Sequence, residues 1–389
     1  GVRTERSVDE IALELSQLLG VDYGEIMIRL EGDSEYSNLA KTVNAETFNA
    51  IRDLEIPWIF FDQFEDRLYP MGAVAGNVLG FVGSDGTPLA GLERQYNTCL
   101  AGVDGQETFE RSAEGVRIPT SNQTTQPTED GGQLNLSIDA NLQFFAQQVL
   151  ADTVNELSAT WASAIVVEVE TGRILAAAEA PTVDPNDPGA VPAADRGSRI
   201  FQAAFEPGSI MKAISSSMVL DTGTADEYDT VPAPDRMNLD FDNEYIKDSF
   251  SHEDFTLSLA GVLRYSSNTG MTNFASQIPR ETRYEYLKKF GFGSVSPLRF
   301  EGESSGILHP ASQWDEMTNL VTTFGQGISV TSLQMAYAYQ AIANGGVRLD
   351  PILVDSCLAA DGSVAYAPNQ GSTRVLSTAS ANLNLELME

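Results

Sequence analysis

A serine and a lysine, Ser209 and Lys212, stand three residues apart where the segment FEPGSIMK (205–212) predicts the start of a helix. Residues with this spacing lie on the same side of a helix, so the Lys212 amine is expected to reach the Ser209 hydroxyl. A neutral amine can accept the hydroxyl proton, and the serine oxygen then becomes a nucleophile without help from a histidine. The first N–H groups of the helix are unpaired and carry positive potential, which suits a developing oxyanion.

The same spacing also occurs where a serine caps a helix and the lysine is solvated, so the pattern alone is weak. Two observations favour the catalytic interpretation. The predicted helix from Ser209 to its end at Gly223 is strongly apolar, and an ammonium buried there tends to lose its proton. Lys212 is also the one lysine that follows a serine by three residues, the others being Lys41, Lys247, Lys288 and Lys289.

A second polar triplet, Ser266-Ser267-Asn268, follows a predicted helix over about 256–265. On a turn after a helix, the Ser266 hydroxyl could relay a proton between the serine–lysine pair and a leaving group. The Asn268 amide could hydrogen-bond a peptide group of a substrate. A plain helix-ending turn is the alternative, because the same spacing recurs at 380–382, where it is predicted to lie on a helix surface.

A rival nucleophile lies in the segment GESSG (302–306), which fits the G-x-S-x-G pattern of α/β-hydrolases. That fold needs a helix directly after the serine and a histidine well downstream. Pro310 follows too soon for such a helix, and the last histidine, His309, is only five residues beyond Ser304. The pattern therefore predicts a flexible loop rather than a nucleophile.

The composition of the 389 residues narrows the class of protein. The length favours two domains, and the formal net charge of −32 argues against binding to nucleic acid or to an anionic membrane. Neither C-x-x-C nor H-E-x-x-H occurs, so neither a metal site nor a cofactor is predicted. The two histidines, His252 and His309, are each expected to be structural.

The two cysteines and the N-terminus do not indicate the cellular compartment of the protein. Cys99 and Cys357 fall in different predicted domains, so a disulfide framework is not expected, and two cysteines are too few to indicate the compartment. No long apolar run predicts a membrane span, and no signal peptide is visible. The sequence begins abruptly at Gly1, so an anchor that precedes it would not be visible here.

Residues 1–132 are predicted to form the first domain. A capping box at Ser7 opens a helix within the mixed structure of the first 60 residues. Short apolar runs alternating with Gly and Pro predict irregular β structure over 58–118. The polar, aperiodic stretch 119–132 predicts an exposed loop or linker that ends this domain.

Residues 133–389 are predicted to form a second domain of the α+β class, in which helices flank an antiparallel sheet. Its sheet is expected to contain the strands 163–169 and 174–178, joined by a hairpin turn at 170–173. A capping box at Thr331 opens a later helix. The domain begins with a strand over 134–138 and a helix capped by Asp139, with one apolar face made of Leu142, Phe145, Ala146, Val149 and Leu157.

Together these segments resemble class B penicillin-binding proteins, the peptidoglycan D,D-transpeptidases, and most of all the division-specific type that is similar to penicillin-binding protein 3. The resemblance extends over nearly the whole chain and implies the transpeptidase fold with an irregular N-terminal pedestal of the dimerisation type. The first two family motifs correspond to Glu206–Lys212 and Tyr265–Met271. Further pieces recur in the family's order at 69–80, 91–93, 136–139, 184–188, 289–293 and 324–331.

The resemblance implies a role for each candidate residue. Ser209 would attack the carbonyl of a stem peptide ending in D-Ala-D-Ala and form an acyl-enzyme, with Lys212 as the general base. Ser266 would shuttle a proton, and Asn268 would bind the donor peptide. An amine of a neighbouring stem peptide would then close the crosslink, and β-lactams would acylate the same serine. No metal or cofactor is implied.

The third family motif, K-T-G or K-S-G on a strand that lines the cleft, is absent from the 389 residues. The nearest match, Lys41-Thr42-Val43, lies in the wrong predicted domain. The missing strand would supply half of the oxyanion hole, and loss of one such donor lowers the rate by about 100- to 1000-fold. The chain is therefore expected to be a shortened form of a longer protein, inactive as it stands and lacking C-terminal strands of its sheet.

For the complete protein, the resemblance implies peptidoglycan crosslinking during cell division, outside the cell membrane to which it would be anchored. The implied partners are a SEDS-family glycosyltransferase and other division proteins. Two other classes stay open. A carboxypeptidase or β-lactamase-like hydrolase would use the same serine and lysine with water in place of the amine, and a division scaffold would use neither.

Overall fold

The computed structural model describes residues 6–31, 36–61, 67–108, 110, 124–241 and 243–389. It divides into two compact units, residues 1–65 and residues 66–389, and each unit is described by itself. This division does not test the domain boundary predicted after residue 132, which stays a prediction. Among the residues that the structure describes, none of the helices has both the length and the apolar character that crossing a bilayer requires.

In its described ranges, 6–31 and 36–61, the first unit contains three helices, α1 (Val8–Leu19), α2 (Tyr23–Glu31) and α3 (Ala45–Arg52). The Ser7 hydroxyl accepts a hydrogen bond from the backbone N–H of Glu10 at 3.2 Å, and the Glu10 carboxylate accepts one from the N–H of Ser7 at 3.0 Å. This reciprocal pair is the predicted capping box, which is confirmed. The buried residues of the unit are Ile11, Ala12, Leu15, Ile26, Ile51 and Ile56.

The prediction of irregular β structure over 58–118 is wrong for most of the described part. Short helices dominate instead, namely α4 (Gly76–Leu79), α5 (Gly91–Gln95) and α6 (Asn97–Leu100), followed by β1 (Gln106–Thr108). Gly80 and Gly91 both have positive φ, and a Cβ on Gly80 would lie 1.9 Å from the Ala90 carbonyl oxygen. The glycines thus mark a close backbone contact between short helices, which a sequence pattern cannot distinguish from a β turn.

The polar stretch at 119–132 is only partly a loop. Its described residues begin with β2 (Thr124–Gln126), which pairs in antiparallel register with β1, and residues 119–123 lie outside the described part. Gly131 and Gly132 then pass close to α6, since a Cβ on Gly132 would lie 2.4 Å from the Cys99 carbonyl oxygen. The end of this stretch therefore lies beside α6, the helix that precedes β1 in the chain.

The expectation that the cysteines stay apart is also wrong, because Cys99 and Cys357 form a disulfide. Cys99 lies on α6, and Cys357 lies fully buried on β13 (Val354–Leu358). Strand β13 pairs with both β14 (Val364–Tyr366) and β3 (Gln133–Leu136), and α6 packs against β3 and β13. The two cysteines are 258 residues apart, so only the tertiary structure reveals that they meet.

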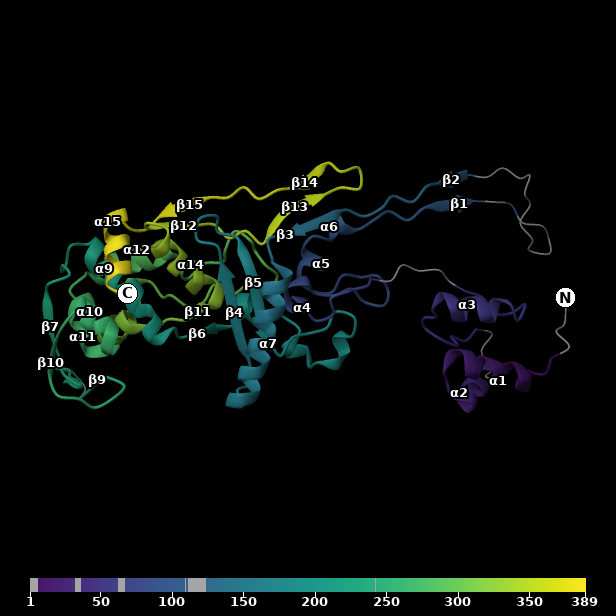
Figure 1. Ribbon diagram of the computed structural model, residues 1–389, viewed down its shortest axis with the longest axis horizontal. Helices are drawn as coiled ribbons and strands as arrows, with labels where there is room; N and C mark the ends of the chain where they lie inside the picture. Colours follow the sequence, from purple (N-terminus) through teal and green to yellow (C-terminus); the bar gives the residue numbers. More distant parts are fainter. Residues whose placement is uncertain (1–5, 32–35, 62–66, 109, 111–123, 242) are drawn as a thin grey trace. The chain divides into compact units, whose positions relative to one another are not determined.

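The predicted hairpin is confirmed as β4 (Ala162–Val167) and β5 (Ile174–Ala180), which pair in antiparallel register. Figure 1 shows helix α7 (Ala140–Leu157) lying along this hairpin, and α14 (Ser332–Ala343) also packs against β4. The capping box that opens α14 is confirmed, because the Thr331 hydroxyl accepts from the Gln334 N–H and the Gln334 side chain accepts from the Thr331 N–H. Sheets flanked by helices make this unit α+β, as predicted.

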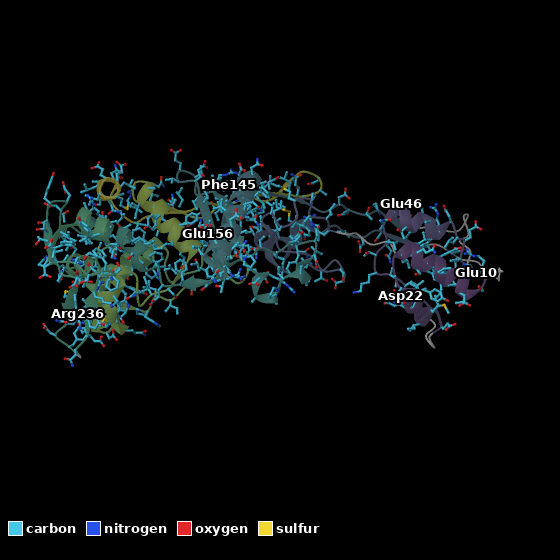
Figure 2. All side chains as sticks on the ribbon, turned by 60° about the horizontal axis from the view of Figure 1, so that its bottom comes forward. Glu10, Asp22, Glu46, Phe145, Glu156 and Arg236 are labelled. Atoms are coloured by element: carbon cyan, nitrogen blue, oxygen red, sulfur yellow. A yellow bond between two sulfur atoms is a disulfide. The ribbon has the colours of Figure 1, made fainter. Side chains whose placement is uncertain are left out.

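Helix α7 begins where Asp139 was predicted to cap it, but its buried face was predicted wrongly. Phe145, Val149 and Leu157 are 65%, 46% and 70% exposed, and Figure 2 labels Phe145 on this helix. The buried residues are Gln143 and Gln147. Gln143 exchanges hydrogen bonds with the N–H and carbonyl of Ala177 on β5, and Gln147 does so with the backbone at 73–75. These amides satisfy buried backbone groups, which an apolar pattern cannot show.

The second half of this unit is mainly helical around one apolar core. The helices are α8 (Arg199–Gln202), α9 (Met211–Asp221), α10 (Leu259–Tyr265), α11 (Asn268–Ala275), α12 (Arg280–Phe290), α13 (Glu316–Val321) and α15 (Thr378–Glu386). Short antiparallel pairs join them, namely β6 (Ala204–Phe205) with β11 (Val330–Thr331), β7 (Thr230–Ala233) with β10 (Phe255–Ser258), β8 (Arg236–Asn238) with β9 (Tyr245–Lys247) and β12 (Val347–Leu349) with β15 (Ser372–Arg374). In Figure 1, α9, α10 and α11 gather at the end of the unit that also holds β7 and β10.

Candidate active site

The turn that carries Ser209 is fixed from two sides. Strand β6 enters it paired with β11, and the Gly208 N–H donates to the Gly325 carbonyl at 2.9 Å. Gly325 has a φ of 86°, and a Cβ there would lie 2.2 Å from the Gly208 carbonyl oxygen. The Gly327 N–H donates to the Glu206 carboxylate at 2.8 Å. A strand pair and a glycine contact therefore set where the helix begins.

The predicted contact between Ser209 and Lys212 is present. Residues Gly208–Ile210 form one 3-10 turn that runs directly into α9, so the two side chains share one face. The Lys212 Nζ donates to the Ser209 Oγ at 2.9 Å. Lys212 is only 2% exposed, whereas Ser209 is exposed. The hydroxyl is thus open to a substrate and the amine behind it is shielded from water.

The environment of Lys212 makes the neutral amine far more accessible than it is for an exposed lysine. Burial lowers the pKa of Lys212 to about 8, and the negative charge of Asp248 raises it in partial opposition. The Nζ also donates to the Ser266 carbonyl at 2.7 Å and to the Ser266 Oγ at 3.1 Å. All three contacts use uncharged oxygens, so none of them supplies the full counter-charge that would hold a proton on the nitrogen.

Ser266 reaches Lys212 through a left-handed turn. It is the C-cap of α10, with φ 52° and ψ 41°, and it directs both its carbonyl and its hydroxyl to the same amine. A non-glycine residue in this conformation is uncommon and is concentrated at functional sites. The predicted turn after a helix is confirmed, although α10 begins at Leu259, because Thr256 belongs to β10.

Ser267 and Asn268 point in different directions. Ser267 is fully buried and caps α11, with its Oγ accepting from the Gly270 N–H at 2.9 Å. Asn268 is partly exposed, and its Nδ2 donates to the Lys247 carbonyl of β9 at 2.9 Å. Of the triplet, Ser266 contacts Lys212, Ser267 belongs to the core, and the Asn268 side chain bonds to β9, so the binding role of Asn268 stays a prediction.

Sequence reasoning missed Asp248 as a residue of the site. Its carboxylate accepts hydrogen bonds from the N–H groups of Asn268 at 2.6 Å and Thr269 at 3.0 Å. The other carboxylate oxygen lies 3.1 Å from the Nε2 of His252. In a chain with 55 acidic residues, a single aspartate after a short strand gives no signal of its own. The one available sign was a histidine four residues after it.

The rival nucleophile has none of the required surroundings. Residues 302–306 lie in a segment of turn and coil, and the Ser304 hydroxyl accepts from the Gly306 N–H at 3.1 Å. No strand-to-helix turn holds Ser304, so the elbow hypothesis is rejected, as the sequence predicted. Over the described ranges, no group of three or more His, Cys, Asp or Glu side chains is arranged to hold a metal ion.

The arrangement as a whole provides a nucleophile with a nearby base and a second hydroxyl. A neutral Lys212 can accept the Ser209 proton across 2.9 Å, which is within hydrogen-bond reach. The Ser266 hydroxyl, at 3.1 Å from the same nitrogen, can pass a proton onward. This geometry suits acyl transfer through a serine ester.

Comparisons with known proteins agree with this chemistry. A family model described as "Penicillin binding protein transpeptidase domain" matches residues 162–386, and one described as "Penicillin-binding Protein dimerisation domain" matches residues 2–136. The match to the first model contains the serine, the lysine and the Ser266–Asn268 turn.

Two named relatives and one solved structure are also similar to this chain. The chain is 32% identical over 380 residues to "Penicillin-binding protein PbpB" of Mycolicibacterium smegmatis, covering 97% of this chain and 58% of that protein. It is 29% identical over 336 residues to "Peptidoglycan D,D-transpeptidase FtsI" of Escherichia coli K12, covering 86% and 56%. The crystal structure of penicillin-binding protein 3 from Mycobacterium tuberculosis with aztreonam matches with a TM-score of 0.72 and 31% identity, covering 82% of this chain and 67% of that one. The chain therefore spans less than two thirds of the length of these two relatives.

Proposed function

Because this chain belongs to the penicillin-binding protein transpeptidase family, we propose that the protein is a peptidoglycan D,D-transpeptidase of the division-specific type. The observation that carries the proposal is the buried Lys212 amine, 2.9 Å from an exposed Ser209 hydroxyl. The relative from Escherichia coli is named as such a transpeptidase, and the relative from Mycobacterium tuberculosis binds aztreonam in its crystal structure.

In the proposed first step, Ser209 Oγ attacks the carbonyl carbon between the two terminal D-alanines of a stem peptide. The hydroxyl proton passes to Lys212 as the C–O bond forms. Collapse of the tetrahedral intermediate breaks the C–N bond, and the departing D-alanine amine takes a proton through Ser266. The product is an ester between Ser209 and the shortened stem peptide. Asn268, held by its bond to the Lys247 carbonyl, binds the donor peptide beside the ester.

In the second step, an amine from a neighbouring stem peptide attacks the ester carbonyl. It loses a proton to Lys212, the C–O bond breaks, and the proton returns to Ser209 as the crosslinking amide forms. The third family motif, K-T-G or K-S-G, does not occur in residues 1–389, so we expect acylation of this chain alone to be slow. Loss of one oxyanion donor costs about 100- to 1000-fold in rate.

The cellular setting is part of the same proposal. The Cys99–Cys357 disulfide supports an oxidising, extracytoplasmic location, because disulfides persist there and are rare in the cytosol. We place the protein outside the cell membrane, held by an anchor, with a SEDS-family glycosyltransferase and other division proteins as partners. The match to the dimerisation domain supports a pedestal role for the N-terminal region, with the domain boundary near residue 132.

Labelling with a fluorescent penicillin tests the proposal. The product of the full reading frame is incubated with the reagent and compared with its Ser209→Ala and Lys212→Ala variants, with Ser304→Ala as the matched control. We expect label on the unchanged protein and on Ser304→Ala, none on Ser209→Ala, and a loss of at least about 100-fold in acylation rate for Lys212→Ala. A folded full-length protein that takes no label would favour the scaffold function instead.

Product analysis then separates the two enzymatic functions. Full-length protein that has not been exposed to penicillin is given a stem-peptide donor with and without an amine acceptor. A crosslinked product that depends on the acceptor supports the transpeptidase, whereas the same hydrolysed product in both samples supports the carboxypeptidase.

A further inference from the structure

The buried carboxylate of Asp248 connects three parts of the site. Its side chain is 1% exposed, and one oxygen accepts from the first two N–H groups of α11, those of Asn268 and Thr269. Its own N–H donates to the Asp235 carbonyl at 2.9 Å, which ties it to the base of the β8–β9 hairpin. The residue thus joins the hairpin to the turn that presents Ser266 and Asn268.

The second oxygen of Asp248 faces His252. The imidazole is 5% exposed and stacks on Phe255 with the ring centroids 4.4 Å apart. Its Nε2 lies 3.1 Å from Asp248, and its Nδ1 lies 2.6 Å from the Glu253 carbonyl oxygen. Both ring nitrogens therefore face acceptors, and both contacts are hydrogen bonds only when both nitrogens carry hydrogen. This geometry favours the imidazolium.

We infer that Asp248 is a positioning residue of the active site. Its carboxylate fixes the start of α11 and supplies a counter-charge to His252, which it contacts, and to Lys212, which contacts Ser266 two residues before the Asn268 N–H that Asp248 binds. The inference deepens the proposed function and rests on it for its catalytic consequence. The turn geometry decides where Ser266 and Asn268 lie, and the counter-charge decides how readily Lys212 gives up its proton.

The pKa shifts of Lys212 and His252 both agree with this assignment. Burial lowers the pKa of Lys212, and Asp248 is the charged group that opposes this by raising it. Desolvation acts to lower the pKa of His252, but its bonds to Glu253 and Asp248 and the charges of Asp248 and Asp235 outweigh this and raise it. A carboxylate that raises the pKa of two basic groups stabilises a proton on each of them.

Several other charged groups surround Asp248 and His252. The described titratable residues of their own hairpin and loop are Asp235, Arg236, Asp240, Glu244, Tyr245, Lys247, Glu253 and Asp254. Of these, Asp235 and Glu253 act on His252, and Asp235 accepts from the Ser251 hydroxyl at 2.8 Å. From the neighbouring helices come Lys212 of α9 and Tyr265 of α10, which contacts Phe255. Asp235 therefore offers a matched control: an acid beside His252 that is not among the causes of the Lys212 shift.

Two substitutions separate charge from geometry. Asp248→Asn keeps an oxygen that accepts from Asn268 and Thr269, and its amide can donate to a neutral His252, so only the charge is lost. Asp248→Ala removes the acceptor as well. Asp235→Asn removes a nearby charge without touching α11.

The test is an NMR titration of residues 1–389 with labelled lysine and histidine side chains. The chain has only five lysines and two histidines, so the spectra are simple, and Lys212→Arg assigns the signal of interest. In Asp248→Asn we expect the titration midpoints of both Lys212 and His252 to fall, that of Lys212 by about one pH unit. In Asp235→Asn only the His252 midpoint should fall.

Amide hydrogen exchange reports the geometry. The N–H groups of Asn268 and Thr269 should stay protected in Asp248→Asn and lose at least about tenfold of their protection in Asp248→Ala. A Lys212 midpoint that does not move in Asp248→Asn, or that moves as far in Asp235→Asn, would overturn the shared counter-charge. Unchanged protection in Asp248→Ala would overturn the positioning role.

These measurements need no substrate. Failure of the intact protein to react with penicillin would refute the proposed function and leave the titrations unaffected. Normal labelling together with unmoved midpoints would refute only the role of Asp248.

Discussion

At the scale of single residues, the chemistry depends on one amine that is buried in the right place. Among the residues that the structure describes, Lys212 has three oxygen partners and no carboxylate in contact with its nitrogen, and burial brings its pKa to about 8. An exposed lysine would stay protonated to well above that pH and could not serve as a base. The sequence identified both Ser209 and Lys212, because a helix places residues three apart on one side.

The depressed pKa of Lys212 predicts how acylation depends on pH. Only the neutral amine can accept the Ser209 proton, so the second-order rate with penicillin should rise as the pH increases through about 8 and then level off. Stopped-flow acylation of the full reading-frame product between pH 6 and 10 measures this profile. A rate that falls over this range would mean that protonated Lys212 is the active form, and the assigned role would be wrong.

At the scale of elements, the site depends on turns that hold two helix ends against each other. The β6–β11 pair and the Gly208–Gly325 contact set the start of α9, and the left-handed Ser266 sets the end of α10. Neither arrangement follows from helix propensity alone. Each requires a partner segment that arrives from more than 50 residues away in the sequence.

Gly325 provides a test of the first arrangement. In Gly325→Ala the new methyl group would meet the Gly208 carbonyl oxygen at 2.2 Å, so the Ser209 turn must shift. We expect acylation by penicillin to fall at least about 100-fold, since small misplacements of reacting groups carry large rate costs. Gly223→Ala is the control, because Gly223 also has positive φ but a Cβ there meets nothing within 4 Å. It should lose some stability and keep its reactivity, so equal losses of reactivity in both variants would contradict the positional argument.

At the scale of the whole unit from 66 to 389, a disulfide ties the region of short helices to the sheet of β3, β13 and β14. Cys99 and Cys357 close a chain segment of 258 residues, which removes conformational freedom from the unfolded state. This link holds α6 against the sheet independently of the apolar contacts around it.

Replacing both cysteines by alanine measures what the link contributes. The double variant should lose about 2–5 kcal/mol of unfolding free energy, seen as a lower Tm by circular dichroism. Reduction of the unchanged protein should bring its Tm close to that of the variant, and reduction of the variant should change nothing. An identical Tm for the oxidised protein and the variant would show that the apolar contacts alone hold α6 in place.

Most of the predictions that the structure confirmed depend on local sequence. Capping boxes at Ser7 and Thr331 and the β4–β5 hairpin are short-range patterns, and each needs only residues a few positions apart. The α+β class follows from these elements. The same holds for the Ser209–Lys212 pair, which lies within one helical turn.

Long-range contacts decided the rest. Whether Gln143 or Phe145 of α7 is buried depends on which backbone groups of β5 need partners, and those groups are set by strand pairing. Asp248 and the two cysteines meet their partners only when distant segments come together, and an isolated aspartate or cysteine carries no periodic signal. Local propensity is fixed by neighbours in the chain, whereas burial and charge are fixed by neighbours in space.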